Sequence, residues 1–80
     1  MTIRVLYFAS LREQAGHAEQ ALELDAPTSV RELARRLEAE RAGLRLSGVL
    51  CAVNEEYAEP ERQLQDGDTV AFFPPVSGGA

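Results

Sequence analysis

The stretch Thr69-Val70-Ala71-Phe72-Phe73-Pro74-Pro75 decides the fold, because it predicts both where the last strand lies and where it ends. Proline cannot donate a hydrogen bond to a neighbouring strand, so we expect the strand to stop at Phe73. The start of the chain, Thr2-Ile3-Arg4-Val5-Leu6-Tyr7-Phe8, has a similar composition and predicts a strand buried on both faces beyond Arg4. Since these are the two most apolar strands, we expect both to lie centrally and to pair in parallel.

One amphipathic helix is predicted between these strands. It begins at Ser29-Val30-Arg31-Glu32, which has the spacing of a capping box. The following apolar residues recur with the spacing of one helix face, at Val30, Leu33, Ala34 and Leu37. Gly43 is expected to end the helix near residue 42, and Glu32 and Arg36 have the spacing of a favourable ion pair.

Shorter elements are predicted in the rest of the chain. One or two helical turns are expected after Phe8, with Ser10 as the N-cap and Gly16 as the stop. The remaining predicted elements are strands at residues 19–24 and 49–53, a hairpin turn at residues 54–57, and a turn at residues 66–68. Leu64 is expected to anchor the loop before the last turn to the core.

The order strand, strand, helix, strand, strand predicts an α+β domain in which one main helix covers a mixed sheet. This arrangement is the β-grasp, the architecture of ubiquitin-like domains. The 80 residues suffice for one such domain, which we place at residues 1–75 and expect to be followed by a flexible C-terminal tail at residues 76–80.

The composition excludes several classes of function. A net charge of −5 and the absence of lysine argue against binding to nucleic acid or to an anionic membrane. The acidity suits a positively charged protein partner, although solubility alone explains it equally well. No segment has the length of a membrane span or of a secretory signal, so a cytoplasmic setting is expected.

The predicted domain offers little chemistry of its own. With one histidine, His17, and one cysteine, Cys51, the chain has no His/Cys cluster, so neither a metal site nor a bound cofactor is expected. Cys51 lies in an apolar run and is predicted to be a buried structural thiol. Acidic pairs occur in the predicted turns, at Glu55-Glu56 and Asp66/Asp68, where carboxylates are usually solvated or bonded to nearby backbone.

The remaining candidate for chemistry is the tail Val76-Ser77-Gly78-Gly79-Ala80, which has no charged side chain. Glycines thread narrow channels, and from Pro75 to Gly79 an extended arm spans about 13–17 Å. A terminal carboxylate becomes reactive only after a step such as adenylation by ATP. Two interpretations stay open at this point, a frayed terminus or an arm that carries a reactive end into a partner's pocket.

With these motifs, the chain resembles the small subunits of molybdopterin synthase, a family of ubiquitin-like sulfur carriers. The resemblance covers nearly all 80 residues and is strongest in residues 5–13, 52–57 and 64–79. It implies that a ubiquitin-activating-like adenylyltransferase uses ATP to adenylate Gly79 and that a sulfur donor protein then supplies the sulfur of a thiocarboxylate. It also implies that the tail enters the large subunit of molybdopterin synthase, where the sulfur passes to cyclic pyranopterin monophosphate. The catalytic lysines then belong to that partner.

The resemblance also implies roles for particular residues. Gly79 would be the carrier, and the residues that enter the partner would be Pro74, Pro75, Val76, Ser77 and Gly78. Phe8 and Phe73 are candidates for an apolar docking face, with ordinary core packing as an equal alternative. Ala80 departs from the family's diglycine end, because it displaces the carboxylate by about 3.5 Å. We favour removal of Ala80 by a protease, while an artificial addition and a block on activation stay open.

Two other functions also stay open. A sulfur carrier for thiamine or cysteine synthesis would share the fold and the diglycine. A ubiquitin-like modifier or binding module would instead attach to lysines of other proteins or act without the tail.

Overall fold

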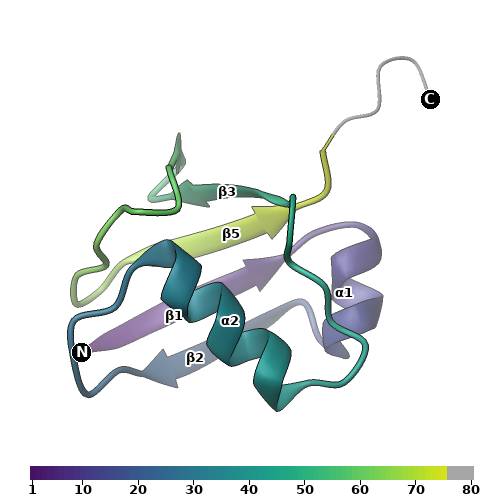
Figure 1. Ribbon diagram of the computed structural model, residues 1–80, viewed down its shortest axis with the longest axis horizontal. Coiled ribbons are helices and arrows are strands. Elements are labelled where there is room, and N and C mark those ends of the chain that lie inside the picture. Colours follow the sequence, from purple (N-terminus) through teal and green to yellow (C-terminus); the bar gives the residue numbers. More distant parts are fainter. Residues whose placement is uncertain (76–80) are drawn as a thin grey trace.

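The computed structural model describes residues 1–75 and shows a five-stranded mixed sheet with one long helix packed across one face (Figure 1). The elements in chain order are β1 (Thr2–Tyr7), α1 (Ser10–Ala15), β2 (Glu19–Glu23), α2 (Val30–Glu40), β3 (Leu50–Val53), β4 (Glu56–Tyr57) and β5 (Thr69–Phe73). The strand order is β2-β1-β5-β3-β4, in which β1 and β5 pair in parallel and the other neighbours pair antiparallel. The predicted β-grasp fold is confirmed, as is the parallel pairing of the first and last strands inside the sheet.

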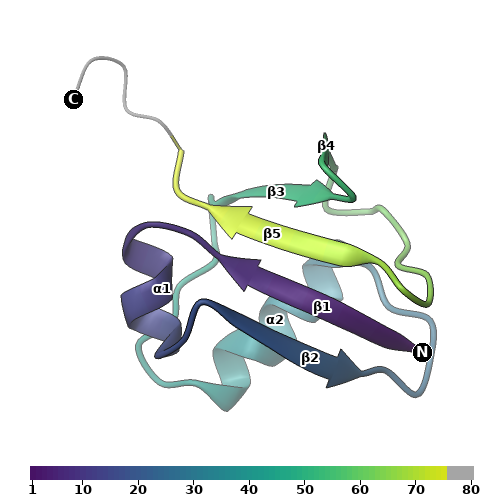
Figure 2. The same ribbon diagram turned by 180° about the vertical axis from the view of Figure 1, so that it is seen from behind.

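The two faces of the sheet differ. On β1, the side chains of Ile3, Val5 and Tyr7 are buried under α2, whereas Arg4 is exposed and Leu6 is half-buried on the other face. Seen from behind, this second face has no helix over it (Figure 2). The prediction that β1 is buried on both faces is therefore wrong, because the single main helix covers one face only.

Local hydrogen bonds explain where α2 begins. Ser29 Oγ accepts from the Glu32 backbone N–H at 3.1 Å, and Glu32 Oε1 accepts from the Ser29 backbone N–H at 2.9 Å. The predicted capping box is thus confirmed, and its hydrogen bonds lower the pKa of Glu32. The expected Glu32–Arg36 pair is wrong, because the Glu32 carboxylate is already committed to the cap.

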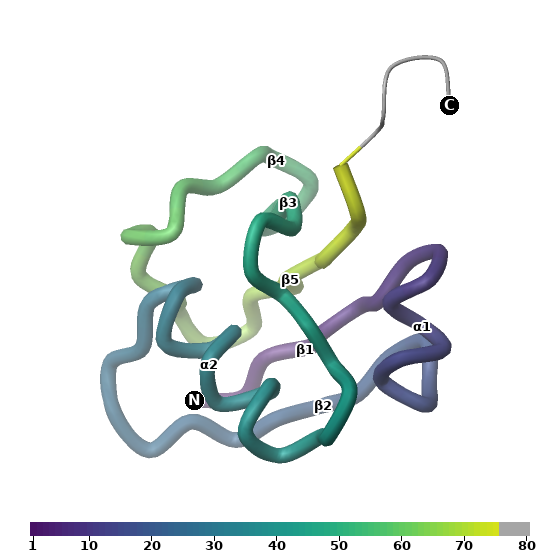
Figure 3. Tube along the Cα trace, turned by 45° about the vertical axis from the view of Figure 1, so that its right-hand side comes forward, coloured from purple at the N-terminus to yellow at the C-terminus, as the bar shows by residue number. Residues whose placement is uncertain are grey.

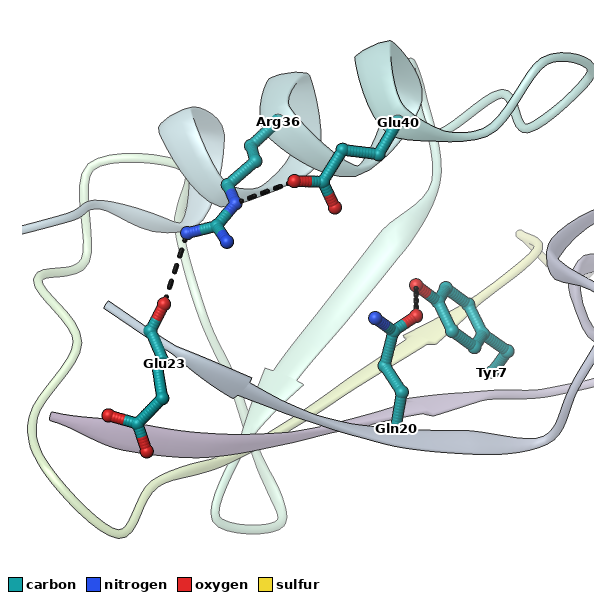
Figure 4. Close-up of polar contacts among 5 residues, drawn as sticks. All are labelled: Tyr7, Gln20, Glu23, Arg36 and Glu40. Carbon is teal, nitrogen blue, oxygen red and sulfur yellow. Dashed lines mark hydrogen bonds and ion pairs between the residues drawn. The ribbon is translucent and has the colours of Figure 1, made fainter. Parts of the chain in front are cut away.

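Arg36 instead connects α2 to the edge of the sheet. Its Nε lies 3.0 Å from Glu40 Oε2, and its Nη1 donates to the Glu23 carbonyl at 3.2 Å (Figure 4). The helix ends at Glu40, and Gly43, with φ +90°, follows in the turn beyond it. The helix therefore stops two residues before the predicted end.

The connection from α2 to β3 crosses the helix side of the sheet near the ends of β1 and β5 (Figure 3). Its Leu44 and Leu46 are buried in the core, and Glu38 accepts from the Leu46 backbone N–H at 2.6 Å. Leu64 is also buried, which confirms its predicted role as an anchor. Loop residues therefore contribute buried side chains to the hydrophobic core, which is small in a domain of this length.

Buried polar contacts fix the turn that precedes β5. Asp68 is buried, and its carboxylate accepts from Asn54 Nδ2 at 2.9 Å and from the Gln65 backbone N–H at 2.8 Å. Asp66 Oδ1 accepts from the Thr2 backbone N–H at 2.7 Å. Both aspartates therefore bond to the protein itself, which confirms that this acidic pair is structural.

Candidate functional site

The chain leaves the sheet at a place that three elements share. β5 ends at Phe73, after which Pro74 is half-buried and Pro75 is exposed. Because β1 runs parallel to β5, it ends at the same side of the domain, and the Phe8 backbone N–H donates to the Phe72 carbonyl at 3.1 Å. Helix α1 follows directly, so the exit is flanked by Phe8 and the start of α1 (Figures 1 and 2).

The uncovered side of the sheet, here called the open face, carries apolar side chains next to this exit. The apolar residues of this face that lie on β1, β5, β3 and β4, together with Phe8 after the end of β1, are Leu6, Phe8, Leu50, Ala52, Tyr57, Ala71 and Phe73, whereas Arg4 and Glu19 form an ion pair farther along it. Three of them are largely exposed, namely Phe8 at 44%, Leu50 at 36% and Tyr57 at 76%. Exposed apolar side chains that gather on one face are typical of surfaces that bind another protein.

Register places the aromatic residues of the open face together. Leu50 lies opposite Phe73 on neighbouring strands, and the rings of Tyr57 and Phe73 have their centroids 5.8 Å apart. Phe73 is half-buried, and Phe8 lies outside the buried core. Ordinary core packing therefore does not describe Phe8, and a role in docking stays a prediction for both residues.

Leu50 and Tyr57 were not predicted from the sequence as parts of this surface. Leu50 alternates with the buried Cys51 on β3, and Tyr57 lies opposite Ala52 on β4. The alternation of β3 is visible in the sequence, whereas the pairing that brings Tyr57 to Phe73 depends on the sheet order.

The predicted tail lies outside the described residues. This applies to Val76, Ser77, Gly78 and Gly79, and to Ala80. Of the predicted tail-insertion residues, the structure places Pro74 and Pro75 directly after the end of β5.

Within residues 1–75, no group of three or more His, Cys, Asp or Glu side chains is arranged to hold a metal ion. The imidazole of His17 is exposed and lies 2.8 Å from Gln20 Oε1. The same Gln20 oxygen accepts from the Tyr7 hydroxyl at 2.9 Å, a contact drawn in Figure 4. Burial, with a smaller effect of the Glu40 charge, raises the pKa of Tyr7 to about 12. The hydrogen bond between Tyr7 and Gln20 joins β1 to β2 at one end of the sheet. No helix in the described part of the chain is long and apolar enough to cross a membrane.

Comparison of the sequence with models of known protein families gives a match. Residues 5–79 match the model of the ThiS family. The chain belongs to the ThiS family. The match ends at Gly79, so it includes both the β-grasp domain and the diglycine.

Similar members of the ThiS family and similar structures extend over nearly the whole chain. The molybdopterin synthase sulfur carrier subunit of Chlamydomonas reinhardtii is 42% identical over 83 residues, covering 99% of this chain and 100% of that protein. A putative molybdopterin converting factor subunit 1 from Pyrococcus furiosus superposes with a TM-score of 0.81 and 32% identity, covering 95% of this chain and 99% of that chain. A chain from the Helicobacter pylori complex of molybdopterin-converting factor subunits 1 and 2 superposes with a TM-score of 0.72 and 26% identity. The match covers 99% of this chain and 100% of that chain.

The one thiol of this ThiS-family chain is poorly suited to chemistry. Cys51 is buried on β3 between α2 and the sheet, and burial raises its pKa to about 11. The prediction of a buried structural thiol is confirmed. Because the folded pKa exceeds the ordinary value of 9.0, the stabilising effect of the neutral thiol is fully present below about pH 9 and is lost as the pH rises toward 11.

We expect iodoacetamide to label Cys51 far more slowly in the folded protein than in the denatured protein at pH 8. The change from 9.0 to about 11 lowers the thiolate fraction by about 100-fold, and burial slows access further. Labelling rates measured by intact mass, with and without denaturant, test this expectation. Equal rates would contradict it.

Proposed function

We propose that this chain is the sulfur carrier subunit of molybdopterin synthase. Its Gly79 would be adenylated, converted to a thiocarboxylate and presented to cyclic pyranopterin monophosphate inside the large subunit. The observation that carries the proposal is the 42% identity to a molybdopterin synthase sulfur carrier subunit across 99% of this chain. The ThiS-family match, which reaches Gly79, supports the same carrier residue.

The open face supports a large-subunit partner. The subunit 1 to which this chain is similar forms a complex with subunit 2 in the Helicobacter pylori structure. In the present chain, Phe8, Leu50, Tyr57 and Phe73 form an apolar surface beside the chain exit. A partner that covers this surface would hold the domain while it receives the tail, and burial of aromatic side chains would supply much of the binding energy.

The chemistry at the carrier residue follows from the weakness of a carboxylate as an electrophile. A terminal carboxylate oxygen of Gly79 attacks the α-phosphate of ATP, and pyrophosphate leaves. Hydrosulfide delivered by the donor protein then attacks the acyl carbon and displaces AMP, and loss of the remaining proton leaves the thiocarboxylate on Gly79. Glycine suits these steps because it places no Cβ next to the reacting carbon.

Three further partners belong to this proposal. The adenylyltransferase binds the ATP, a separate protein donates the sulfur, and a protease removes Ala80 so that Gly79 carries the free carboxylate. The cytoplasmic setting expected from the sequence supplies the ATP. The carrier itself would bind no cofactor.

Intact mass measurement tests the proposal directly. We expect a form ending at Gly79 to gain the mass difference between sulfur and oxygen when it is incubated with the adenylyltransferase, ATP and the sulfur donor. The form that retains Ala80 is the matched control and should remain unchanged without the protease. Absence of the mass gain in the form ending at Gly79 would overturn the carrier function.

A second experiment separates the alternatives. Expression in a strain that lacks its molybdopterin synthase small subunit should restore molybdopterin synthesis. Rescue of a thiamine or cysteine pathway instead would identify another sulfur carrier, and isopeptide adducts on lysines of other proteins would identify a modifier.

A further inference from the structure

The residue that follows Phe8 has a strained backbone. Ala9 has φ +53° and ψ −132°, a conformation that glycine adopts readily and that other residues avoid. It also precedes α1 without any side-chain cap, which corrects the prediction that Ser10 is the N-cap. Strain of this kind persists only where the surrounding structure enforces it, and it is concentrated at functional sites.

Two residues after α2 hold the far end of α1. Arg41 Nε donates to the Gln14 carbonyl at 3.3 Å, and the Arg45 backbone N–H donates to Gln14 Oε1 at 3.0 Å. The Arg41 guanidinium also lies against Gly16, since a Cβ built on Gly16 would lie 2.5 Å from Arg41 Nη2. Gly16, with φ +86°, therefore both ends α1 as predicted and leaves room for Arg41.

The position of α1 is transmitted to Phe8 through backbone hydrogen bonds. The Leu11 backbone N–H donates to the Phe8 carbonyl at 3.1 Å, and the Arg12 backbone N–H donates to the Ala9 carbonyl at 3.1 Å. Leu11 is buried in the core, so the first turn of α1 cannot shift without moving Phe8. The Phe8 side chain is nevertheless exposed at the chain exit.

We propose that Ala9 and Arg41 are positioning residues that hold the Phe8 ring outward on the open face, ready for the partner. Ala9 turns the chain sharply from β1 into α1, and Arg41 keeps α1 in the orientation that this turn requires. The orientation of the ring stands on the geometry alone, whereas its use in docking to the large subunit rests on the proposed function.

The first experiment needs no partner. The chain has no tryptophan, so Phe8→Trp introduces a single indole reporter that can be excited selectively. We expect Arg41→Ala in this background to lower the steady-state anisotropy of the introduced indole, because the ring gains nanosecond mobility. The matched control is Arg62→Ala, which removes an exposed arginine from a loop remote from α1 and should leave the anisotropy unchanged. An unchanged anisotropy in Arg41→Ala would overturn the proposal.

The second experiment is a double-mutant cycle on binding to the large subunit. We expect Arg41→Ala to raise the Kd about tenfold in the wild-type background and to have no further effect in a Phe8→Ala background. If Arg41→Ala weakened binding through a general structural defect, its effect on the Kd would add in full to the effect of Phe8→Ala. This result would overturn the proposal. If the unaltered chain does not bind the large subunit, the proposed function fails, while the anisotropy measurement still decides the positioning role.

Ala9 provides an independent pair of variants. Ala9→Gly should keep the Kd and raise the free energy of unfolding, because glycine adopts this φ without strain. Ala9→Val should weaken binding, and in the Phe8→Trp background it should lower the indole anisotropy, because a β-branched residue disfavours a positive φ. Equal binding and equal anisotropy in the two variants would contradict a positioning role for Ala9.

Discussion

A chain cut after Ser77 should be as stable as the full chain and yet transfer no sulfur. The hydrophobic core is built from residues between Ile3 and Phe72, and the last strand ends at Phe73. Removal of residues 78–80 therefore leaves the described core and sheet in place. It moves the terminal carboxylate from Gly79 back to Ser77, which shortens the arm by two residues and places a Cβ next to the acyl carbon. We expect product formation with the large subunit to fall to the background of the assay.

Stability and sulfur transfer are measured separately, and we expect the shortened chain to keep the first and lose the second. Denaturant unfolding should give the same midpoint and the same slope for the shortened chain and for a chain ending at Gly79. In the presence of the large subunit, dithiolene formation from cyclic pyranopterin monophosphate should occur with the chain ending at Gly79 and not with the shortened chain. Residual sulfur transfer by the shortened chain would place the reactive group at Ser77 or in the domain and would contradict a requirement for Gly79.

The parts of the fold that were predicted correctly depend on local sequence. The capping box at Ser29 and Glu32 is formed by residues three apart, and the apolar composition of β1 and β5 places both inside the sheet. The stop after Phe73 follows from the chemistry of proline alone. For such features, neighbouring residues already contain the physical cause.

The parts that were missed depend on contacts between distant residues. The open face of β1 is exposed because no second helix within residues 1–75 covers it, and the alternation of Arg4 and Leu6 does not reveal this. Tyr57 joins the open face only through the pairing of β4 with β3 and of β3 with β5. Likewise, the helix that follows the strained Ala9 is held at its far end by Arg41, a residue that lies beyond α2 in the sequence.

The candidate site was predicted in part for the same reason. Phe8 and Phe73 were identified through resemblance, and the structure brings their backbones to one end of the sheet. The role of Gly79 is chemical rather than conformational, so the fold of residues 1–75 gives it no test. The role of Gly79 is therefore part of the proposed function, and the intact mass measurement tests it.

Phe8→Asp should abolish stable association with the large subunit while the domain remains folded. The ring is 44% exposed in the free chain, so its loss should lower the free energy of unfolding by only about 1 kcal/mol. In a complex that covers the open face, the new carboxylate would be buried without a partner among Leu50, Tyr57 and Phe73. Hot-spot aromatics and buried unpaired charges each cost several kcal/mol, so we expect the Kd to rise about 100-fold or more.

Matched variants separate this effect from a change in net charge. Ala39→Asp adds the same charge at an exposed position on α2, on the helix side of the sheet, and it should change the Kd by less than about threefold. Phe8→Leu keeps an apolar side chain and should weaken binding by about tenfold at most. If Phe8→Asp bound as tightly as Ala39→Asp, the partner would have to hold the carrier by its tail or by its helix side, and the open face would then need another explanation for its exposed aromatic residues.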